Sequence, residues 1–283
     1  MYKCSIITIC RNAEKEISKT IESVLNQDYN FKEIEMIIVD GLSSDNTKNV
    51  VDSYMSEANK KGLIINFNSE KDKGIYDAMN KGIDYAKGEW CLFLNAGDYF
   101  FYDKSLSNLL DGDISNYNIV YGDTVHNYDN KFTIVKSKYE SELNYKNGME
   151  FCHQSCIIRT DYLKNHKYSL DYKIAGDCDF FTNAYINKIR FHYIPKVVSV
   201  FSRDGLSSKN GAMVYKENNY IKYKYGLVTE KEYLKANKKY NVKIKIRSFF
   251  PKRIINMRQK KIMDKATANW KSYIELLNSI VNN

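Results

Sequence analysis

Four short apolar runs, each followed by polar residues and then by a segment with helical spacing, constrain the fold of this chain more than any other feature. The apolar runs are residues 4–10, 34–39, 63–68 and 90–94. The segments with apolar residues at helical spacing are 14–26, 46–59 and 74–87. Strands that alternate with helices in this way predict a mostly parallel central sheet with helices on both faces.

The remainder of the chain is less regular but also predicts packed structure. Further strands are predicted at residues 119–123 and 191–201, an added hairpin arm at 132–135 and a helix at 177–187, and another apolar run lies at 156–159. A hydrophobic content of 43% over 283 residues indicates a globular protein with a large core. We expect a main domain over residues 1–210 and a basic, mostly helical C-terminal extension over residues 211–283.

The net charge of +9 is concentrated in this extension. Residues 215–283 contain 17 Lys and Arg against 5 Asp and Glu, which leaves the rest of the chain at −3. This balance, with no nucleic-acid motif in the main domain, argues against nucleic acid as a partner. Residues 248–265 mix apolar and basic side chains, which predicts an amphipathic helix on an anionic membrane surface. The alternative is a helix that packs on the main domain or on a second subunit of a homo-oligomer.

The cysteines and the lengths of the apolar runs predict where the protein is found. Six cysteines lie mostly in apolar runs without Cys-x-x-Cys spacing, which indicates reduced thiols rather than a zinc site. The first apolar run is too short for a signal peptide, and no run approaches the roughly 20 residues that span a bilayer. We expect a cytoplasmic protein, peripheral at the inner face of the membrane if its extension binds there.

Polar side chains follow each of the four strands at the point where the strand ends. They are Arg11 and Asn12, Asp40, Glu70 and Asp72, and Asn95 and Asp98. In parallel sheets, ligands bind outside the carboxyl ends of the strands. The sequence therefore predicts one ligand site built from four strand ends.

Several segments at these strand ends resemble the motifs of the family 2 glycosyltransferases, which have the Rossmann-like GT-A fold. They are SIITICRNAEKEISKTIESVLNQ, IEMIIVDGLSSDNT, SEKDKGIYDAMNKGIDYAKGEWCLFLNAGD, IAGDCDFF and FSRDGLSS. The segment FCHQS is similar to one in the branch that makes bacterial surface polysaccharides. The resemblance covers about residues 3–208. It implies a nucleotide-sugar-binding and catalytic domain that moves a sugar, from a UDP-sugar in most relatives, to a hydroxyl of a saccharide or lipid-linked acceptor with inversion.

The resemblance also implies which residues bind the nucleotide. An ionised Asp40 suits the imide N–H of uracil, although a turn aspartate before Gly41 is the alternative. Thr8 and Arg11 are expected at the base or ribose, and Arg11 could instead meet a phosphate. The remaining positions matched to the donor site include Ser43, Asn95 and Ala96.

Asp72, Lys73 and Gly74 precede the predicted helix at 74–87. Backbone amides at the start of a helix, together with a lysine, suit an anion such as a diphosphate. Simple helix capping by Asp72 is the alternative.

Asn95-Ala96-Gly97-Asp98 aligns with the Asp-x-Asp-type motif of the family, which binds Mn²⁺ or Mg²⁺ at the diphosphate. A hard cation stabilises the negative charge that develops on the leaving group. Asp98 matches the acidic position expected to touch the metal. His153 is a candidate second ligand that suits Mn²⁺ better than Mg²⁺, with a structural role or an acceptor contact as alternatives.

Asp177 matches the general base of the family, which deprotonates the acceptor hydroxyl as it attacks. Asp179 is the rival candidate for the base, and an N-cap role for Asp177 is compatible with catalysis. Asp179, His153, Gln154 and Arg203 are further candidates for contacts with the acceptor or the diphosphate.

Three other functions compete with a glycosyltransferase. A non-catalytic nucleotide-sugar or glycan binding protein would explain the loss of acidic residues at Asn95 and Gly97, but the retained Asp98 and Asp177 disfavour it. A nucleotidyltransferase would need a glycine-rich loop after the first strand, where CRNAEKE has none. A nucleic-acid binder would rest on the basic extension alone.

Overall fold

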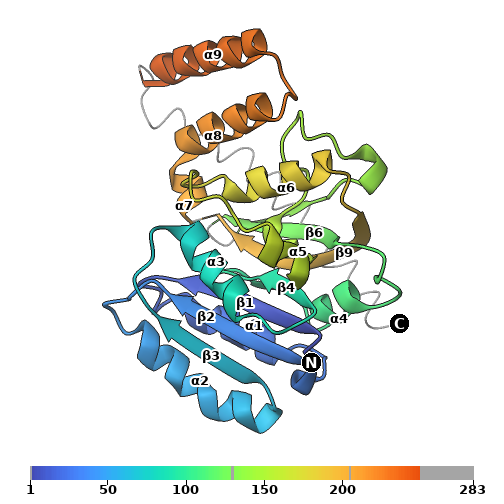
Figure 1. Ribbon diagram of the computed structural model, residues 1–283. Helices are drawn as coiled ribbons and strands as arrows, with labels where there is room; N and C mark the ends of the chain where they lie inside the picture. Colours follow the sequence, from blue (N-terminus) through green and yellow to red (C-terminus); the bar gives the residue numbers. More distant parts are fainter. Residues whose placement is uncertain (1, 129–130, 204, 249–283) are drawn as a thin grey trace.

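The computed structural model describes residues 2–128, 131–203 and 205–248. Within these residues, nine strands form one sheet in the order β3-β2-β1-β4-β8-β6-β9-β5, and β7 pairs with β6. Figure 1 shows this sheet between layers of helices, with α8 and α9 stacked at one end of the molecule. The predicted amphipathic segment 248–265 lies outside the described residues except for Ser248.

The first four strands are parallel, as the alternation of strands and helices predicted. They are β1 (Cys4–Cys10), β2 (Ile34–Asp40), β3 (Ile64–Ser69) and β4 (Trp90–Phe93). The helices between them are α1 (Ile17–Leu25), α2 (Thr47–Lys61) and α3 (Ile75–Tyr85). A parallel pair requires a crossover connection, and these helices provide it.

Beyond β4 the sheet is mixed rather than parallel. The remaining strands are β5 (Tyr99–Phe100), β6 (Ile119–Tyr128), β7 (Lys131–Val135), β8 (Cys156–Arg159) and β9 (Phe191–Ser202). β8 runs antiparallel to both β4 and β6, whereas β6 and β9 are parallel. The prediction of a parallel sheet therefore holds for the half that begins the chain.

Six more α-helices come after α3 among the described residues. They are α4 (Ser105–Leu110), α5 (Thr160–Asn165), α6 (Gly176–Ile186), α7 (Leu206–Lys209), α8 (Gly211–Lys224) and α9 (Glu230–Ser248). Short 3₁₀ helices span Phe31–Glu33, Glu140–Glu142 and His153–Ser155. None of the helices among the described residues has the length and apolar character needed to cross a bilayer.

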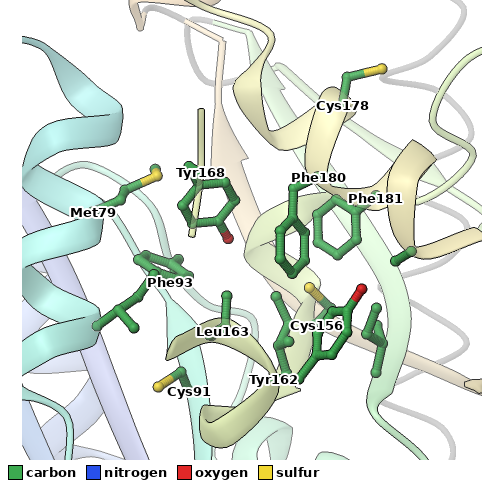
Figure 2. Packing of buried hydrophobic residues seen from close by; sticks show 14 of the residues in the cluster. Met79, Cys91, Phe93, Cys156, Tyr162, Leu163, Tyr168, Cys178, Phe180 and Phe181 are labelled. Carbon is green, nitrogen blue, oxygen red and sulfur yellow. The ribbon is translucent and has the colours of Figure 1, made fainter. Parts of the chain in front are cut away.

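Two hydrophobic clusters cover the two faces of the sheet. Alternate residues of β1 divide between them, with Ile6 packed toward α1 and α2 and Ile7 packed toward α3. Figure 2 shows the second cluster, where Met79 and Phe93 lie near Tyr168, Phe180 and Phe181. Ile221 of α8 is fully buried in the same cluster, so the first helix of the extension packs into the core of the sheet domain.

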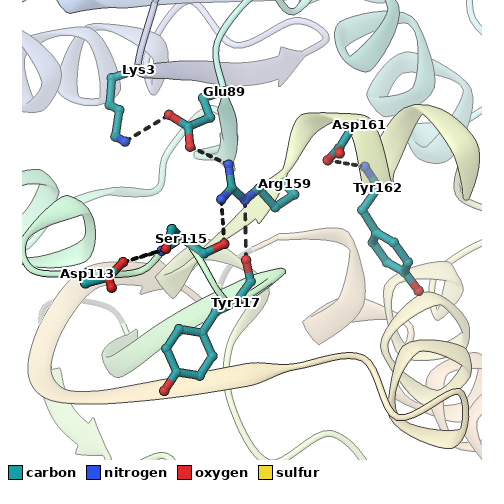
Figure 3. A network of polar contacts seen from close by, with 8 residues as sticks. All are labelled: Lys3, Glu89, Asp113, Ser115, Tyr117, Arg159, Asp161 and Tyr162. Atoms are coloured by element: carbon teal, nitrogen blue, oxygen red, sulfur yellow. Dashed lines mark hydrogen bonds and ion pairs between the residues drawn. The ribbon is translucent and has the colours of Figure 1, made fainter.

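A polar network connects strands at the end of the sheet opposite to the predicted ligand site. Glu89, just before β4, pairs with Lys3 at 2.9 Å and with the Arg159 guanidinium at the end of β8 (Figure 3). Arg159 Nη2 also donates to Ser115 O at 2.9 Å, and its guanidinium lies over the Trp90 ring. This arrangement anchors the start of β4, the strand whose other end carries Asp98.

Gly88 approaches β1 so closely that a side chain does not fit. A Cβ at this position would lie 2.5 Å from Ser5 N and 2.7 Å from Cys4 C, which are backbone atoms that cannot rotate away. We expect Gly88→Ala to lower the free energy of unfolding by about 1–3 kcal/mol, measured by urea denaturation. Gly211→Ala is the matched control, because a Cβ there meets nothing within 4 Å. Equal denaturation midpoints for the two variants would contradict this packing.

Candidate active site

The carboxyl ends of β1 and β2 and the loop after β3 meet as predicted. Gly41 N donates to Cys10 O at 2.8 Å. Asp72 lies against the Gly41 backbone, since a Cβ built on Gly41 would be 2.3 Å from Asp72 Oδ2 and 3.4 Å from Arg11 Cβ. Three of the predicted site residues, Arg11, Asp40 and Asp72, are thus neighbours at one edge of the sheet.

Asp40 is buried and its carboxylate is held by four protein donors. Ser43 N donates to Oδ2 at 2.9 Å, the Ser43 hydroxyl donates to Oδ1, and the Ser69 hydroxyl donates to Oδ2 at 2.6 Å. The Cys10 thiol contacts Oδ1 at 3.6 Å and is the weakest donor. A carboxylate accepts about four hydrogen bonds. The N–H group of a nucleobase bound at Asp40 would therefore take the place of the hydrogen bond from the Cys10 thiol.

The other predicted nucleotide contacts differ in their exposure. Thr8 is fully buried, and its hydroxyl donates to Leu94 O at 2.8 Å, which holds the end of β4 against β1. Arg11 is exposed just beyond β1. Thr8 therefore supports the floor of the site, whereas Arg11 is free to meet a ligand there.

Asp72 caps the segment before α3, as the alternative prediction proposed. Its Oδ1 accepts from Gly74 N at 2.9 Å, and Asp77 Oδ2 accepts from Lys73 N at 2.9 Å. Gly74 has φ +131°, a conformation that favours glycine. The backbone N–H groups of Gly74 and Lys73 already donate to the carboxylates of Asp72 and Asp77. The predicted contact with an anion therefore depends mainly on the exposed ammonium group of Lys73.

Asp98 lies in a tight turn after β4 and is 4% exposed. Its backbone N donates to Asn95 O, and the Thr20 hydroxyl donates to its carbonyl at 2.8 Å. Its carboxylate Oδ1 accepts from Ser202 N at 2.9 Å. Burial raises the pKa of Asp98 to about 8, against the opposing effect of hydrogen bonds from Ser202 and Gln154. Asn95 Oδ1, three residues earlier in the same turn, is buried without a hydrogen-bond partner among the described residues.

These oxygens fit a hard divalent cation. A cation at Asp98 would favour the ionised carboxylate that burial disfavours, and it would give Asn95 Oδ1 the partner that it lacks. Among the described residues, no group of three or more His, Cys, Asp or Glu side chains is arranged to hold a metal. Protein ligands from Asp98 and Asn95 would therefore need to be completed by phosphate oxygens and water, which is ordinary for Mg²⁺.

His153 lies in an aromatic environment rather than open to solvent. Its ring centroid is 4.9 Å from that of Phe93 and 5.5 Å from that of Phe181, and Nε2 lies 2.8 Å from the Tyr168 hydroxyl. Burial lowers the pKa of His153 to about 3, so the imidazole is neutral at neutral pH. These contacts favour the structural alternative, and the metal-ligand role stays a prediction.

Replacing His153 by Phe separates the two roles. We expect the aromatic ring to fill the same space but to leave the Tyr168 hydroxyl unpaired, at a cost of about 1–3 kcal/mol in the free energy of unfolding. The Mn²⁺ concentration for half-maximal donor binding, measured by calorimetry, should stay unchanged. A large rise in that concentration would instead identify His153 as a metal ligand.

Asp177 is in the first turn of α6 and faces α3. Its Oδ1 accepts from Cys178 N at 2.9 Å and contacts the Tyr76 hydroxyl at 3.0 Å. The same hydroxyl donates to Ile174 O at 2.6 Å. Desolvation by burial raises the pKa of Asp177, which brings a carboxylate closer to the strength of a useful base.

Asp179 is turned toward α8 instead. Lys224 Nζ contacts its Oδ1 at 2.8 Å, and Asp179 is 7% exposed. The Lys224 ammonium already occupies the Asp179 carboxylate, so an acceptor hydroxyl would have to displace it. The geometry therefore favours Asp177 over its rival.

Asp98 and Asp177 both act on the thiol of Cys152. Burial is the main cause that raises the pKa of this thiol to about 12, and the charges of Asp98 and Asp177 contribute in the same direction. Gln154, on the same segment, accepts from the Cys152 thiol at 3.0 Å and bonds Asp98. The FCHQS segment thus lies against the turn after β4 and near the start of α6.

Arg203 follows directly on Ser202, whose amide holds Asp98. Its guanidinium lies over the rings of Tyr128 and Phe201, at 5.4 and 5.8 Å from their centroids, and its Nε is buried with no hydrogen-bond partner in the part of the chain that the structure describes. This placement supports a contact with a ligand at Asp98. Asp204, the next residue, lies outside the described residues.

Two residues of the site were not predicted. Tyr76 has the helical spacing of a core residue and is 3% exposed, so the pattern alone assigns it to packing. Ser202 contributes only its backbone amide, which is independent of side-chain type. The segments KGIYDAMN and FSRDG, quoted for the resemblance, contain both residues and were the available signal.

Comparison with known proteins identifies relatives across most of the chain. The sequence profile of the family described as Glycosyl transferase family 2 matches residues 5–172. A PGL/p-HBAD biosynthesis glycosyltransferase of Mycobacterium bovis is 27% identical over 205 residues, covering 71% of this chain and 77% of that protein. The GalNAc(5)-diNAcBac-PP-undecaprenol beta-1,3-glucosyltransferase of Campylobacter jejuni is 27% identical over 229 residues, covering 76% and 71%.

Solved structures show the same fold at lower identity. S. aureus TarS 1–349 in complex with UDP-GlcNAc superposes with a TM-score of 0.63 at 21% identity, over 77% of this chain and 66% of that one. The mannosyltransferase PcManGT from Pyrobaculum calidifontis, in complex with GDP-Man and Mn²⁺, gives 0.62 at 16% identity, over 83% and 68%. The chain thus spans about two thirds of the length of these solved chains, whose likeness shows the GT-A fold.

Proposed function

The chain belongs to glycosyl transferase family 2, and on that premise we propose that it is an inverting glycosyltransferase. Its donor would be a nucleotide sugar, a UDP-sugar in our proposal, and its acceptor a hydroxyl of a saccharide or lipid-linked saccharide. The observation that carries this proposal is that two carboxylates, the buried Asp98 and the half-buried Asp177, both lie close enough to the Cys152 thiol for their charges to raise its pKa. One carboxylate suits a metal and diphosphate, and the other suits a base.

Asp177 would act as the general base. Inversion requires a base that removes the proton of the acceptor hydroxyl on the face opposite to the leaving group. The Tyr76 hydroxyl lies 3.0 Å from Asp177 Oδ1 and 2.6 Å from Ile174 O, and the hydrogen bond that it donates to Asp177 favours the ionised carboxylate that acts as base. Once Asp177 has taken the acceptor proton, the Tyr76 hydroxyl can donate to Ile174 O and accept from the Asp177 carboxyl group.

Asp98 and Asn95 would hold a divalent cation, Mn²⁺ or Mg²⁺, that stabilises negative charge on the leaving nucleoside diphosphate. Arg203 and Lys73 are the cationic side chains that we propose at the same diphosphate. Gln154 would orient Asp98 through its amide, and Ser202 would do so through its backbone N–H.

The nucleoside would lie along the edge formed by Arg11, Asp40 and Asp72. We propose that the Asp40 carboxylate accepts a hydrogen bond from an N–H group of the nucleobase. The hydrogen bond from Ser43 N orients this carboxylate. TarS was solved with UDP-GlcNAc and PcManGT with GDP-Man, so the fold accommodates more than one base. Our choice of UDP rests on the fit of an ionised Asp40 to uracil.

The names of the relatives support a role in polysaccharide or glycolipid biosynthesis. The names mention PGL/p-HBAD biosynthesis, a GalNAc(5)-diNAcBac-PP-undecaprenol acceptor and, for TarS, poly(ribitol-phosphate). We propose that this chain works at the inner face of the membrane and that residues 249–265, outside the described residues, contribute to docking there. A homo-oligomer and the division of the chain at residue 210 remain parts of this proposal.

A donor panel tests the proposed function. The full chain is incubated with UDP-, GDP- and dTDP-sugars, with and without Mn²⁺, and release of the nucleoside diphosphate is measured. We expect metal-dependent release with a UDP-sugar. Thermal shifts with a donor but no release, even with saccharide acceptors present, would favour the non-catalytic binding protein. No shift and no release with any donor would refute the proposal.

A further inference from the structure

Glu217 of α8 binds the turn at residues 173–175, which leads into α6, the helix that carries Asp177. Its carboxylate accepts hydrogen bonds from three successive backbone amides, those of Lys173 and Ile174 at 3.0 Å and of Ala175 at 2.8 Å. Asp177 is two residues beyond this turn. A single carboxylate that satisfies three consecutive N–H groups fixes the course of the backbone there, because each bond has a preferred direction.

The turn is also held from the opposite side. Ile174 donates its N–H to Glu217 and accepts at its carbonyl from the Tyr76 hydroxyl, which itself contacts Asp177. Glu217, Ile174, Tyr76 and Asp177 therefore form a continuous chain of hydrogen bonds from α8 to the base. A shift of the turn would move both ends of this chain.

A second contact fastens the same helix to α6. Lys224 pairs with Asp179 at 2.8 Å, and Ile221 between Glu217 and Lys224 is fully buried in the core. Helix α8 is thus fixed at three points along one face. It begins at Gly211, beyond residues 5–172 that match the family profile, so this brace comes from the C-terminal part of the chain.

The charge of Glu217 also acts on the base. After desolvation, the Glu217 carboxylate is among the groups that raise the pKa of Asp177. The other titratable groups that interact electrostatically with Asp177 lie on α3, on α6 and on the segments around them. They are Tyr76, Cys152, Cys156, Tyr168 and Cys178. The pKa values of these thiols and phenols are raised by burial, so they are neutral at neutral pH, whereas Glu217 is a carboxylate.

We propose that Glu217 is a positioning residue for sugar transfer, which holds the 173–175 turn so that Asp177 faces the acceptor hydroxyl. This inference rests on the proposed role of Asp177. It assigns to α8 a part in catalysis that acts through the 173–175 turn.

Three variants test this role. In Glu217→Gln the charge is lost and an amide NH₂ faces backbone donors, so we expect kcat to fall about 10- to 100-fold, as misplacement of a reacting group does. The acid limb of the kcat profile should move to lower pH, because a charge that raised the pKa of Asp177 is gone. Glu217→Asp keeps the charge but shortens the reach, so kcat should fall while the acid limb stays. KM for the donor should not change in either variant.

Glu230→Gln is the matched control, since Glu230 is exposed in the first turn of α9 and its replacement removes the same charge. Hydrogen exchange of the 173–175 amides gives a readout without turnover, and we expect faster exchange in Glu217→Gln than in Glu230→Gln. Equal kcat, acid limbs and exchange in these two variants would overturn the inference. Absence of transfer by the unaltered chain would instead refute the proposed function, and unchanged turnover in Asp177→Asn would refute the base.

Discussion

Replacement of Asp177 by Asn is expected to lower the rate of sugar transfer by about 10²–10⁴-fold, the usual contribution of a positioned general base. Asn keeps the size of the side chain and can still accept from Cys178 N, so the turn should persist. Donor binding should be unaffected, because the nucleotide edge at Asp40 and the metal oxygens at Asp98 are unaltered. The measurement is the rate of product formation at saturating donor, with donor affinity determined separately.

The pH dependence of the unaltered protein provides a second check on the base. Because burial raises the pKa of Asp177, the acid limb of kcat should lie above the ordinary aspartate value of about 3.9. Activity should fall as pH drops through this limb, since the protonated carboxyl cannot accept the acceptor proton. In Asp177→Asn the limb should disappear along with most of the rate.

Asp179→Asn is the comparison that decides between the two candidate bases. It breaks the ion pair with Lys224, so we expect lower stability but a rate close to that of the unaltered protein under conditions where the variant is folded. If Asp179→Asn loses transfer and Asp177→Asn retains it, the base assignment is reversed. Comparison of rates per folded molecule, from activity and circular dichroism on the same samples, removes the effect of stability.

Replacement of Asp98 by Asn is expected to abolish metal-dependent donor binding and yet to stabilise the metal-free protein at alkaline pH. The folded-state pKa of about 8 is far above the ordinary value of about 3.9. A carboxyl whose pKa is raised on folding favours the folded state fully at low pH, and this advantage is lost as pH rises from about 4 to 8. Asn is neutral throughout and avoids that loss.

The expected gain is a few kcal/mol at about pH 8–9 and nearly zero at about pH 4, by linkage between ionisation and folding. The gain is reduced by about 1–3 kcal/mol because the new NH₂ group faces the Ser202 or Gln154 donor. Thermal denaturation in EDTA across this range measures it. Asp52→Asn on the exposed side of α2 is the control, where Asp52 pairs with Lys48 at the surface.

Adding Mn²⁺ and UDP should reverse the order of stability. The unaltered protein should gain about 2.7 kcal/mol at a ligand concentration 100 times Kd, because a ligand that binds only the folded state stabilises it. Asp98→Asn should gain little. If Asp98→Asn still gains stability from UDP only when Mn²⁺ is present, Asp98 is not the metal ligand and the site must be built elsewhere.

The first half of the fold was predictable because burial on both faces leaves a direct pattern in the sequence. The run 4–10 became β1 over Cys4–Cys10, and the run 34–39 became β2 with one residue more. Helices α1 and α3 alternate apolar and polar faces at a period near four residues, which also identified them. Because parallel strands point their carboxyl ends to one edge, Asp40 and Asp98 could be placed at a common edge without any structure.

The second half was less predictable because an apolar run is the same whichever way its strand runs. β8 was recognised as an apolar run at 156–159, but its antiparallel pairing with β4 and β6 depends on the path of the chain between them. The extension over residues 211–283 was predicted to be mostly helical. Its packing on α6 through the single buried Ile221 was not, since one apolar residue forms no pattern.

By itself, the sequence determined the order of strands and helices in the first half, the family resemblance and the acidic residues worth testing. Only the tertiary structure decided how these residues differ in chemistry. Asp177 and Asp179 are two positions apart, yet Asp179 is paired with Lys224, 45 residues away in the chain, while Asp177 faces Tyr76, 101 residues away. The strength of a base depends on burial and on charges within a few ångströms, and these are properties of distance in space rather than of spacing along the chain.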